Sequence, residues 1–104
     1  MSMNYKRGVK LEYRVKKFYE DLGYFVVRSA GSHSIADLVV IGYGKVYLVQ
    51  CKAMPVNKIK RSEVLELIET CRKYGATPVL VYKKNHENEI VGGEENLLKL
   101  VEQK

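Results

Sequence analysis

Cysteine is scarce in this sequence, and long apolar runs are absent. The only cysteines among the 104 residues, Cys51 and Cys71, form no CxxC pair and have no histidine cluster beside them. This excludes a disulfide framework or a zinc site built on cysteine pairs, and it predicts buried thiols. No apolar stretch approaches the roughly 20 residues that span a bilayer. The N-terminus also lacks the apolar core of a signal peptide, so we expect a cytoplasmic protein that is not bound to a membrane.

Acidic residues are the minority among the charged side chains. Twelve Asp and Glu stand against eighteen Lys and Arg, which gives a formal charge of +6. A basic balance favours a polyanionic partner, because each neutralised phosphate releases counterions on binding. A basic surface that only maintains solubility is the alternative interpretation of the same composition. The length allows one modest hydrophobic core, so we expect a single domain over residues 1–104.

The hydrophobic pattern predicts an α/β domain with the order αβββαβ, followed by an edge strand and a terminal helix. Gly42 and Gly44 flank a short connection between two β-rich runs, which indicates an antiparallel hairpin. A strand, helix and strand over 46–82 predict a right-handed crossover and hence a parallel pair within a mixed sheet. Ser62 is a plausible N-cap of the second helix. The expected helices are 9–22, 62–74 and 94–102, and the expected strands are 24–28, 36–41, 46–51, 77–82 and a short one at 90–91.

Three polar residues of the hairpin stand out as a candidate site. Side chains alternate along a strand, so Gln50 and Lys52 share one face, and the hairpin brings Asp37 towards them at one edge of the sheet. An aspartate oxygen suits Mg²⁺, and a nearby ammonium can orient water or stabilise charge on a phosphate. The spacing alone also fits a turn aspartate and an exposed lysine at a strand end.

A longer stretch carries a resemblance to a known family. "RSAGSHSIADLVVIGYGKVYLVQCKA", residues 28–53, resembles the core of the archaeal Holliday junction resolvases, members of the PD-(D/E)xK nuclease superfamily. "KRGVKLEYRV" upstream and "RSEVLELIETCRKYGATPVLVYK" downstream extend the similarity to about residues 6–83. The resemblance implies a restriction-endonuclease-like core, with a mixed central β-sheet flanked by helices. It also implies a Mg²⁺-dependent endodeoxyribonuclease, with Mn²⁺ as a possible substitute.

The resemblance assigns roles to individual residues. It implies that Asp37 is a metal ligand, that Lys52 is the catalytic lysine and that Glu12 completes the metal site from the first helix. Ser32 would lie in the loop near the scissile phosphate. The glutamate of the family's E-x-K motif falls on Gln50, which offers one neutral carbonyl oxygen and is therefore a weaker metal ligand.

The glutamine leaves open where the missing negative charge comes from and what the protein does. Glu12 is one source, and the helix residues Glu63 and Glu66 are others. The Q-x-K form also occurs in Mrr-type restriction endonucleases, which makes duplex cleavage an alternative to resolving junctions. A catalytically impaired module that only binds DNA junctions is a further alternative.

The resemblance also implies partners. The substrate would be a branched four-way DNA junction, and the protein would act in DNA recombination and repair as a homodimer that places two active sites on the junction. Phosphate contacts position DNA without reading its sequence, so structure-selective binding fits better than sequence-specific binding. The expected DNA-binding residues are Lys6, Arg7, Lys10, Arg28, Lys58, Lys60 and Arg61.

Overall fold

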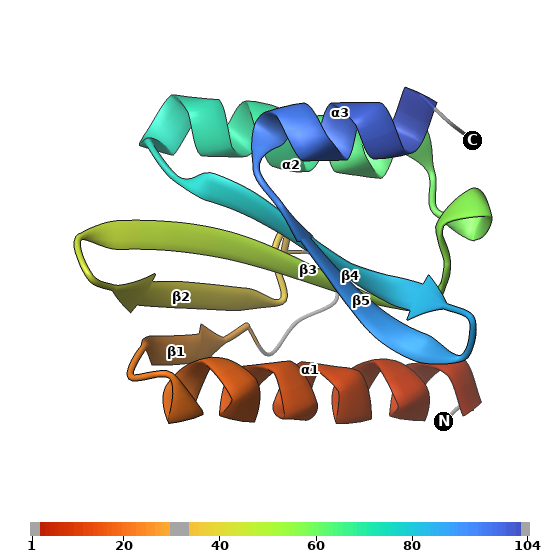
Figure 1. The fold of residues 1–104 in the computed structure, drawn as a ribbon, viewed down its shortest axis with the longest axis horizontal. Coiled ribbons are helices and arrows are strands. Elements are labelled where there is room, and N and C mark those ends of the chain that lie inside the picture. The colour runs from red at the N-terminus through yellow and green to blue at the C-terminus, as the bar shows by residue number, and fades with distance from the viewer. Residues whose placement is uncertain (1–2, 30–33, 103–104) are drawn as a thin grey trace.

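A five-stranded sheet forms the centre of the protein, with one helix on one face and two on the other (Figure 1). The structure is a computed structural model that describes residues 3–29 and 34–102, with side chains from Arg7 onward. The mixed sheet flanked by helices confirms the predicted fold class. The elements in chain order are α1 Met3–Asp21, β1 Phe25–Arg28, β2 Leu38–Gly42, β3 Lys45–Pro55, the 3-10 turn η1 Val56–Lys58, α2 Arg61–Tyr74, β4 Thr77–Lys84, β5 Glu87–Gly92 and α3 Glu94–Glu102.

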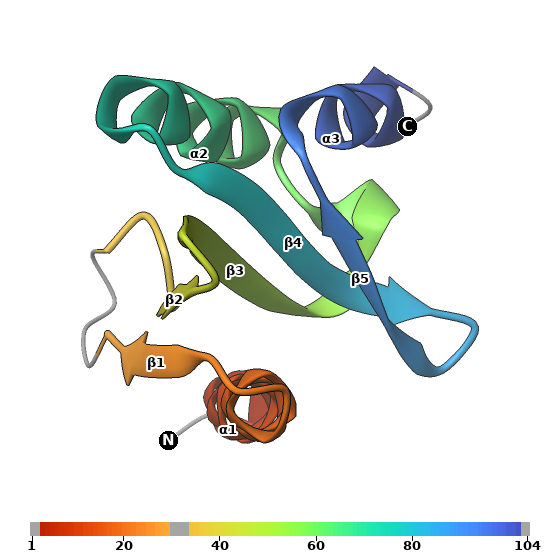
Figure 2. The same cartoon turned by 60° about the vertical axis from the view of Figure 1, so that its left-hand side comes forward.

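The strands lie in the order β1-β2-β3-β4-β5, with a single parallel pair in the middle. β1 pairs with β2, β2 with β3, and β4 with β5 in antiparallel fashion, whereas β3 and β4 are parallel. The chain crosses from β3 to β4 through α2, on the face opposite α1 (Figure 2). The predicted hairpin and the predicted parallel pair, joined through a helix, are therefore both confirmed.

The β2–β3 hairpin closes through the two residues Tyr43 and Gly44. Their φ angles are 55° and 74°, as in the mirror-image turns whose twist matches that of paired strands. Glycine takes such angles freely, but Tyr43 does not. Its hydroxyl donates a hydrogen bond of 2.7 Å to the Leu22 carbonyl, which ties the turn to the end of α1.

Each face of the sheet has its own hydrophobic core. On the α1 side, leucine, valine and tyrosine residues of the helix pack on alternate residues of the strands, including Val49 and Cys51 of β3. On the α2 and α3 side, the helices pack on the intervening residues, including Leu80 and Tyr82 of β4. The side chains of Gln50 and Lys52 therefore belong to the α2 side, because strand residues alternate.

Several element boundaries differ from those expected. α1 begins at Met3 rather than Val9, and β3 continues to Pro55 rather than ending at Cys51. Ser62 as the N-cap of α2 is wrong, because Lys60 takes that position without a side-chain cap and its carbonyl accepts the Glu63 N–H at 3.1 Å. The helix thus starts before the serine.

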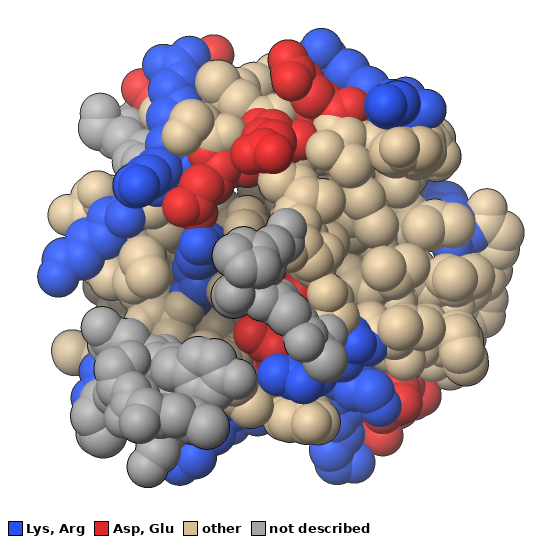
Figure 3. Space-filling model, turned by 180° about the vertical axis from the view of Figure 1, so that it is seen from behind, with Lys and Arg blue, Asp and Glu red and all other residues tan. Residues whose placement is uncertain are grey.

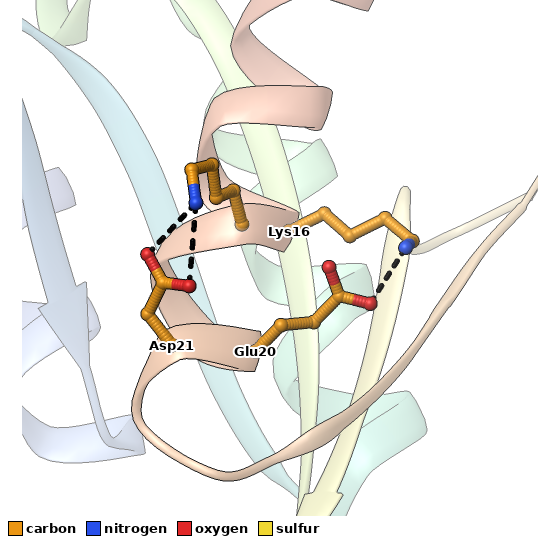
Figure 4. A network of polar contacts seen from close by, with 4 residues as sticks. Lys16, Glu20 and Asp21 are labelled. Atoms are coloured by element: carbon orange, nitrogen blue, oxygen red, sulfur yellow. Dashed lines mark hydrogen bonds and ion pairs between the residues drawn. The ribbon is translucent and has the colours of Figure 1, made fainter.

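Two ion pairs lie along the outer surface of α1 near its C-terminal end (Figure 4). Lys16 Nζ is 2.7 Å from Glu20 Oε2, and Lys17 Nζ is 3.2 Å from Asp21 Oδ2. Both pairs are four residues apart and at least partly exposed, so each adds little to stability. Glu20 and Asp21 are thereby engaged locally on α1.

Candidate active site

Asp37 is fixed at the start of β2 by its own backbone and by its carboxylate. Its N–H donates to the Val49 carbonyl at 2.9 Å, and its carbonyl accepts the Ser29 N–H at 2.8 Å. Regular β2–β3 pairing ends at Val49, and from there the Cys51 N–H donates to Asp37 Oδ2 at 2.7 Å. The Asp37 carboxylate thus takes the place of a backbone carbonyl as the acceptor of the next hydrogen bond in the ladder. This bond uses Oδ2, and Oδ1 does not take part in it.

Gln50 follows Val49, and Asp37 precedes Leu38, where Leu38 and Val49 are the last regular pair of the β2–β3 ladder. The side chain is 8% exposed, and its Oε1 atom is buried without a hydrogen-bond partner among the described residues. A buried carbonyl oxygen that lacks a donor is costly, so such an atom in a native site calls for a water or a cation. Oε1 therefore marks a position where a further polar ligand is needed.

Lys52 lies in an irregular part of β3. The β3–β4 register shifts between Cys51 and Pro55, and irregularities of this kind redirect side chains beside functional sites. Lys52 Nζ is 2.6 Å from Glu63 Oε2 in the first turn of α2, with the two side chains 23% and 34% exposed. The motif lysine is thus held by a carboxylate from another element.

Glu12 approaches the same region from α1. Its Oε1 accepts a hydrogen bond of 2.9 Å from Arg28 Nε, and the two side chains are 14% and 21% exposed. Burial, and then the charge of Asp37, raise the pKa of Glu12, while Arg28 opposes the shift. The charge of Asp37 thus disfavours the ionised form of Glu12.

Burial also raises the pKa of Asp37. The Cys51 N–H and the charges of Lys52 and Arg28 act in the opposite direction. The charges of two cations therefore favour the ionised form of Asp37. Figure 3 shows the molecule from behind. Near the centre of this face, acidic and basic side chains lie next to one another.

The donor set of this site is one that a hard divalent cation accepts. Mg²⁺ prefers oxygen ligands and commonly takes one or two carboxylates, and Asp37, Glu12 and the orphaned Gln50 Oε1 are all oxygens. Within residues 3–29 and 34–102, no three His, Cys, Asp or Glu side chains are grouped as a metal site would require. Gln50 lowers the number of carboxylates here, because it stands where the E-x-K motif has its carboxylate.

The structure brings together five of the residues named from the sequence and separates the others. Asp37, Gln50, Lys52, Glu12 and Arg28 form one cluster. Ser32 and the side chain of Lys6 lie outside the described residues. The exposed Lys58, Lys60 and Arg61 lie around the N-terminus of α2, and Arg7 and Lys10 line a separate groove.

This groove, which we call the basic groove, runs between the N-terminal half of α1 and the β4–β5 turn. It has a volume of about 710 Å³, and its cationic lining consists of Arg7, Lys10, Arg14 and Lys83, with His86 beside them. None of the described residues that line it is acidic. The sequence could have indicated Arg14, because residues 7, 10 and 14 fall on one helix face. No feature of the sequence indicated that Lys83 would lie opposite them.

Both cysteines are free and buried, as the sequence predicts. Burial raises the pKa of Cys71 to about 11. Burial, and then the charge of Asp37, also raise the pKa of Cys51. Thiols that stay protonated are poor nucleophiles and poor metal ligands, so we expect neither thiol to bind metal or to attack a phosphate.

Comparison with known proteins connects this chain to one family. The family model described as "Archaeal holliday junction resolvase (hjc)" matches residues 3–102. A relative in Methanocaldococcus jannaschii, named crossover junction endodeoxyribonuclease Hjc, is 33% identical over 89 residues. The match covers 84% of this chain and 66% of that relative, so the chain spans just under two thirds of the relative's length.

Two solved structures share the fold. Hjc of Archaeoglobus fulgidus, described as a Holliday junction resolvase from an archaeal hyperthermophile, superposes with a TM-score of 0.61 at 16% identity, covering 89% of this chain and 88% of that one. A structure described as a VRR_NUC domain gives 0.54 at 25% identity, covering 92% and 95%. In the part of the chain that the structure describes, no helix has the length and hydropathy of a membrane span.

Proposed function

Since the chain belongs to the archaeal Holliday junction resolvase family, we propose that it is a metal-dependent endodeoxyribonuclease that resolves four-way DNA junctions. The observation that carries this proposal is the hydrogen bond from the N–H of Cys51, the residue between Gln50 and Lys52, to the carboxylate of Asp37, together with a Gln50 Oε1 atom that is buried without a hydrogen-bond partner among the described residues. A carboxylate, an uncharged oxygen ligand and an ammonium at one point are the groups that phosphodiester hydrolysis requires.

In this proposal each residue of the cluster has one task. Asp37, Gln50 and Glu12 would hold Mg²⁺ or Mn²⁺, which supplies Lewis acidity and lowers the pKa of a bound water. The ammonium of Lys52 would orient the attacking water or stabilise charge on the phosphate. Arg28 limits the repulsion between Glu12 and Asp37 by pairing with Glu12.

The direct experiment compares two substrates of identical sequence. A labelled four-way junction and a linear duplex are incubated with the protein and Mg²⁺, and we expect cleavage of the junction near its branch point. Equal cleavage of the duplex would instead identify a duplex endonuclease of the Mrr type. Tight, salt-sensitive binding of the junction without cleavage would identify a non-catalytic binding module.

The basic groove supports DNA as the partner, and it gives a matched pair of variants. Lys83 lines the groove, whereas its exposed neighbour Lys84 does not. We expect Lys83→Ala to weaken junction binding about threefold to tenfold and to reduce the slope of log Kd against log salt by about 0.9, because one phosphate contact is lost. Fluorescence anisotropy at several salt concentrations measures both. If Lys84→Ala weakens junction binding as much as Lys83→Ala does, the proposal that DNA binds in the basic groove is contradicted.

An exposed apolar face supports a homodimer. Phe25, Ile41 and Val46 are cross-strand neighbours on β1, β2 and β3, and Val27, Val39 and Leu48 form the next row. These side chains point away from α1, because their alternate neighbours Val26, Leu38 and Val40 pack against it. Phe25 is 67% exposed and Ile41 is 42% exposed. Contiguous exposed apolar residues of this kind mark interaction sites.

A second copy of the chain is the occupant that we propose for this apolar face. A four-way junction must be cut in two strands, and each chain carries one candidate site, so resolution requires two chains. The next row of the same sheet face contains Asp37 and Gln50, which would place each active site beside the dimer interface.

Substitution within the apolar face tests the dimer. We expect Ile41→Glu to lower the mass measured by light scattering from twice the chain mass to the chain mass, because the carboxylate would be buried without a partner. Tyr74→Glu, at a 70% exposed position on α2, serves as the control and should leave the mass unchanged. A wild-type protein that is monomeric at micromolar concentration would contradict the interface.

A further inference from the structure

The α2 side of the candidate site has few negative charges. Gln50 replaces the carboxylate of the motif, and Asp37 is the only acidic residue that the motif itself contributes. Glu12 comes from the opposite side of the sheet, and Arg28 already neutralises it at 2.9 Å. A divalent cation with a single unpaired carboxylate would bind weakly.

Glu63 lies on the side where the charge is missing. It belongs to the first turn of α2, and its Oε2 is 2.6 Å from Lys52 Nζ. Lys52 shares its strand face with Gln50 and also acts electrostatically on Asp37, where it opposes the larger effect of burial on the pKa of that carboxyl. Lys52 thus pairs directly with Glu63 of α2 and acts electrostatically on Asp37 of β2.

Gln50 gives a second and independent indication of a ligand. Its side chain is more than nine-tenths buried, and Oε1 has no partner among the described residues. The side chain points to the α2 side of the sheet, as Lys52 does, because the alternate residues Val49 and Cys51 pack towards α1. An oxygen that lacks a donor thus faces the region that Glu63 enters.

We propose that Glu63 supplies the carboxylate that the Q-x-K motif lacks, and that it binds the divalent cation together with Asp37 and Gln50. This inference rests on the proposed function, because it concerns the metal of the same site. Lys52 would then exchange its Glu63 partner for the substrate phosphate or the attacking water. The motif and the first turn of α2 together would provide two carboxylates and one amide oxygen.

Binding of Mn²⁺ without DNA tests this assignment, with free Mn²⁺ measured by electron paramagnetic resonance. We expect Glu63→Gln to raise the Kd about 10- to 100-fold. Glu66→Gln is the matched control, since Glu66 is exposed on the same helix and the substitution removes the same charge. The double variant Gln50→Glu with Glu63→Gln returns the carboxylate to the motif position, and its Kd should be within about threefold of wild type.

The variants separate this inference from the proposed function. If Glu63→Gln binds Mn²⁺ as tightly as wild type while Asp37→Asn does not, the metal site stands and the role of Glu63 is overturned. An equal loss in Glu63→Gln and Glu66→Gln, or a loss that the double variant does not recover, would also overturn it. Unchanged binding in both Asp37→Asn and Glu63→Gln would remove the metal site itself.

Discussion

Replacing Asp37 with asparagine is expected to abolish cleavage of a four-way junction in Mg²⁺. The amide oxygen of asparagine can still accept the Cys51 N–H, which now donates to Asp37 Oδ2 at 2.7 Å, so the strand end should keep its structure. The charge that attracts the cation is lost, and we expect the single-turnover rate to fall by about 10²- to 10³-fold or more. Quenched-flow or gel assays with end-labelled junctions measure the rate.

Asparagine is a sharper choice than alanine at this position. Asp37→Ala would leave the Cys51 N–H without its acceptor, and part of any loss would then reflect damage to β3. Asp21→Asn, at the exposed end of α1, is the control for a general change in charge and should cleave at the wild-type rate. A junction-cleaving Asp37→Asn protein with wild-type kinetics would mean that cleavage occurs elsewhere or belongs to a contaminant.

Replacing Lys52 with methionine should give a protein that binds the junction but scarcely cuts it. Methionine keeps the apolar stem of the side chain and removes only the ammonium. We expect the cleavage rate to fall by about 10²- to 10³-fold, since a charged group aimed at the reacting phosphate is lost. Junction affinity, measured by anisotropy at fixed salt, should fall by no more than about tenfold, because at most one phosphate contact disappears.

Metal binding distinguishes Lys52 from the ligands. The ammonium competes with the cation for Glu63, so Lys52→Met should bind Mn²⁺ at least as tightly as wild type. Lys45→Met, an exposed lysine at the start of the same strand, controls for the loss of one positive charge. Wild-type cleavage by Lys52→Met would exclude Lys52 from the chemistry, and lost junction binding would make it a binding residue.

The elements and their order followed from local signals in the sequence. Gly42 and Gly44 marked the hairpin, and the alternation of β3 placed Gln50 and Lys52 on one face, as the two cores of the structure show. The hairpin register also brought Asp37 and Gln50 to the same end of the β2–β3 ladder, because a two-residue turn fixes the pairing of both strands. These features depend on short-range geometry, which the sequence encodes directly.

The features that the sequence did not determine depend on how distant elements pack. Glu63 was one of three possible sources of charge, and only the placement of α2 against β3 brings it to 2.6 Å from Lys52. The register shift after Cys51 and the position of Lys83 opposite α1 likewise depend on tertiary packing. Alternation put Phe25 and Ile41 on one face but did not show that both are exposed there.

The measurement that tests the central claim most directly is anomalous diffraction from crystals soaked in millimolar Mn²⁺. The claim is that the site binds a divalent cation although Gln50 replaces the motif carboxylate. We expect an anomalous peak about 2.1 Å from a carboxylate oxygen of Asp37 and from Gln50 Oε1, with Glu63 turned from Lys52 towards it. Crystals that contain Mn²⁺ elsewhere but show no peak at these residues would contradict the claim.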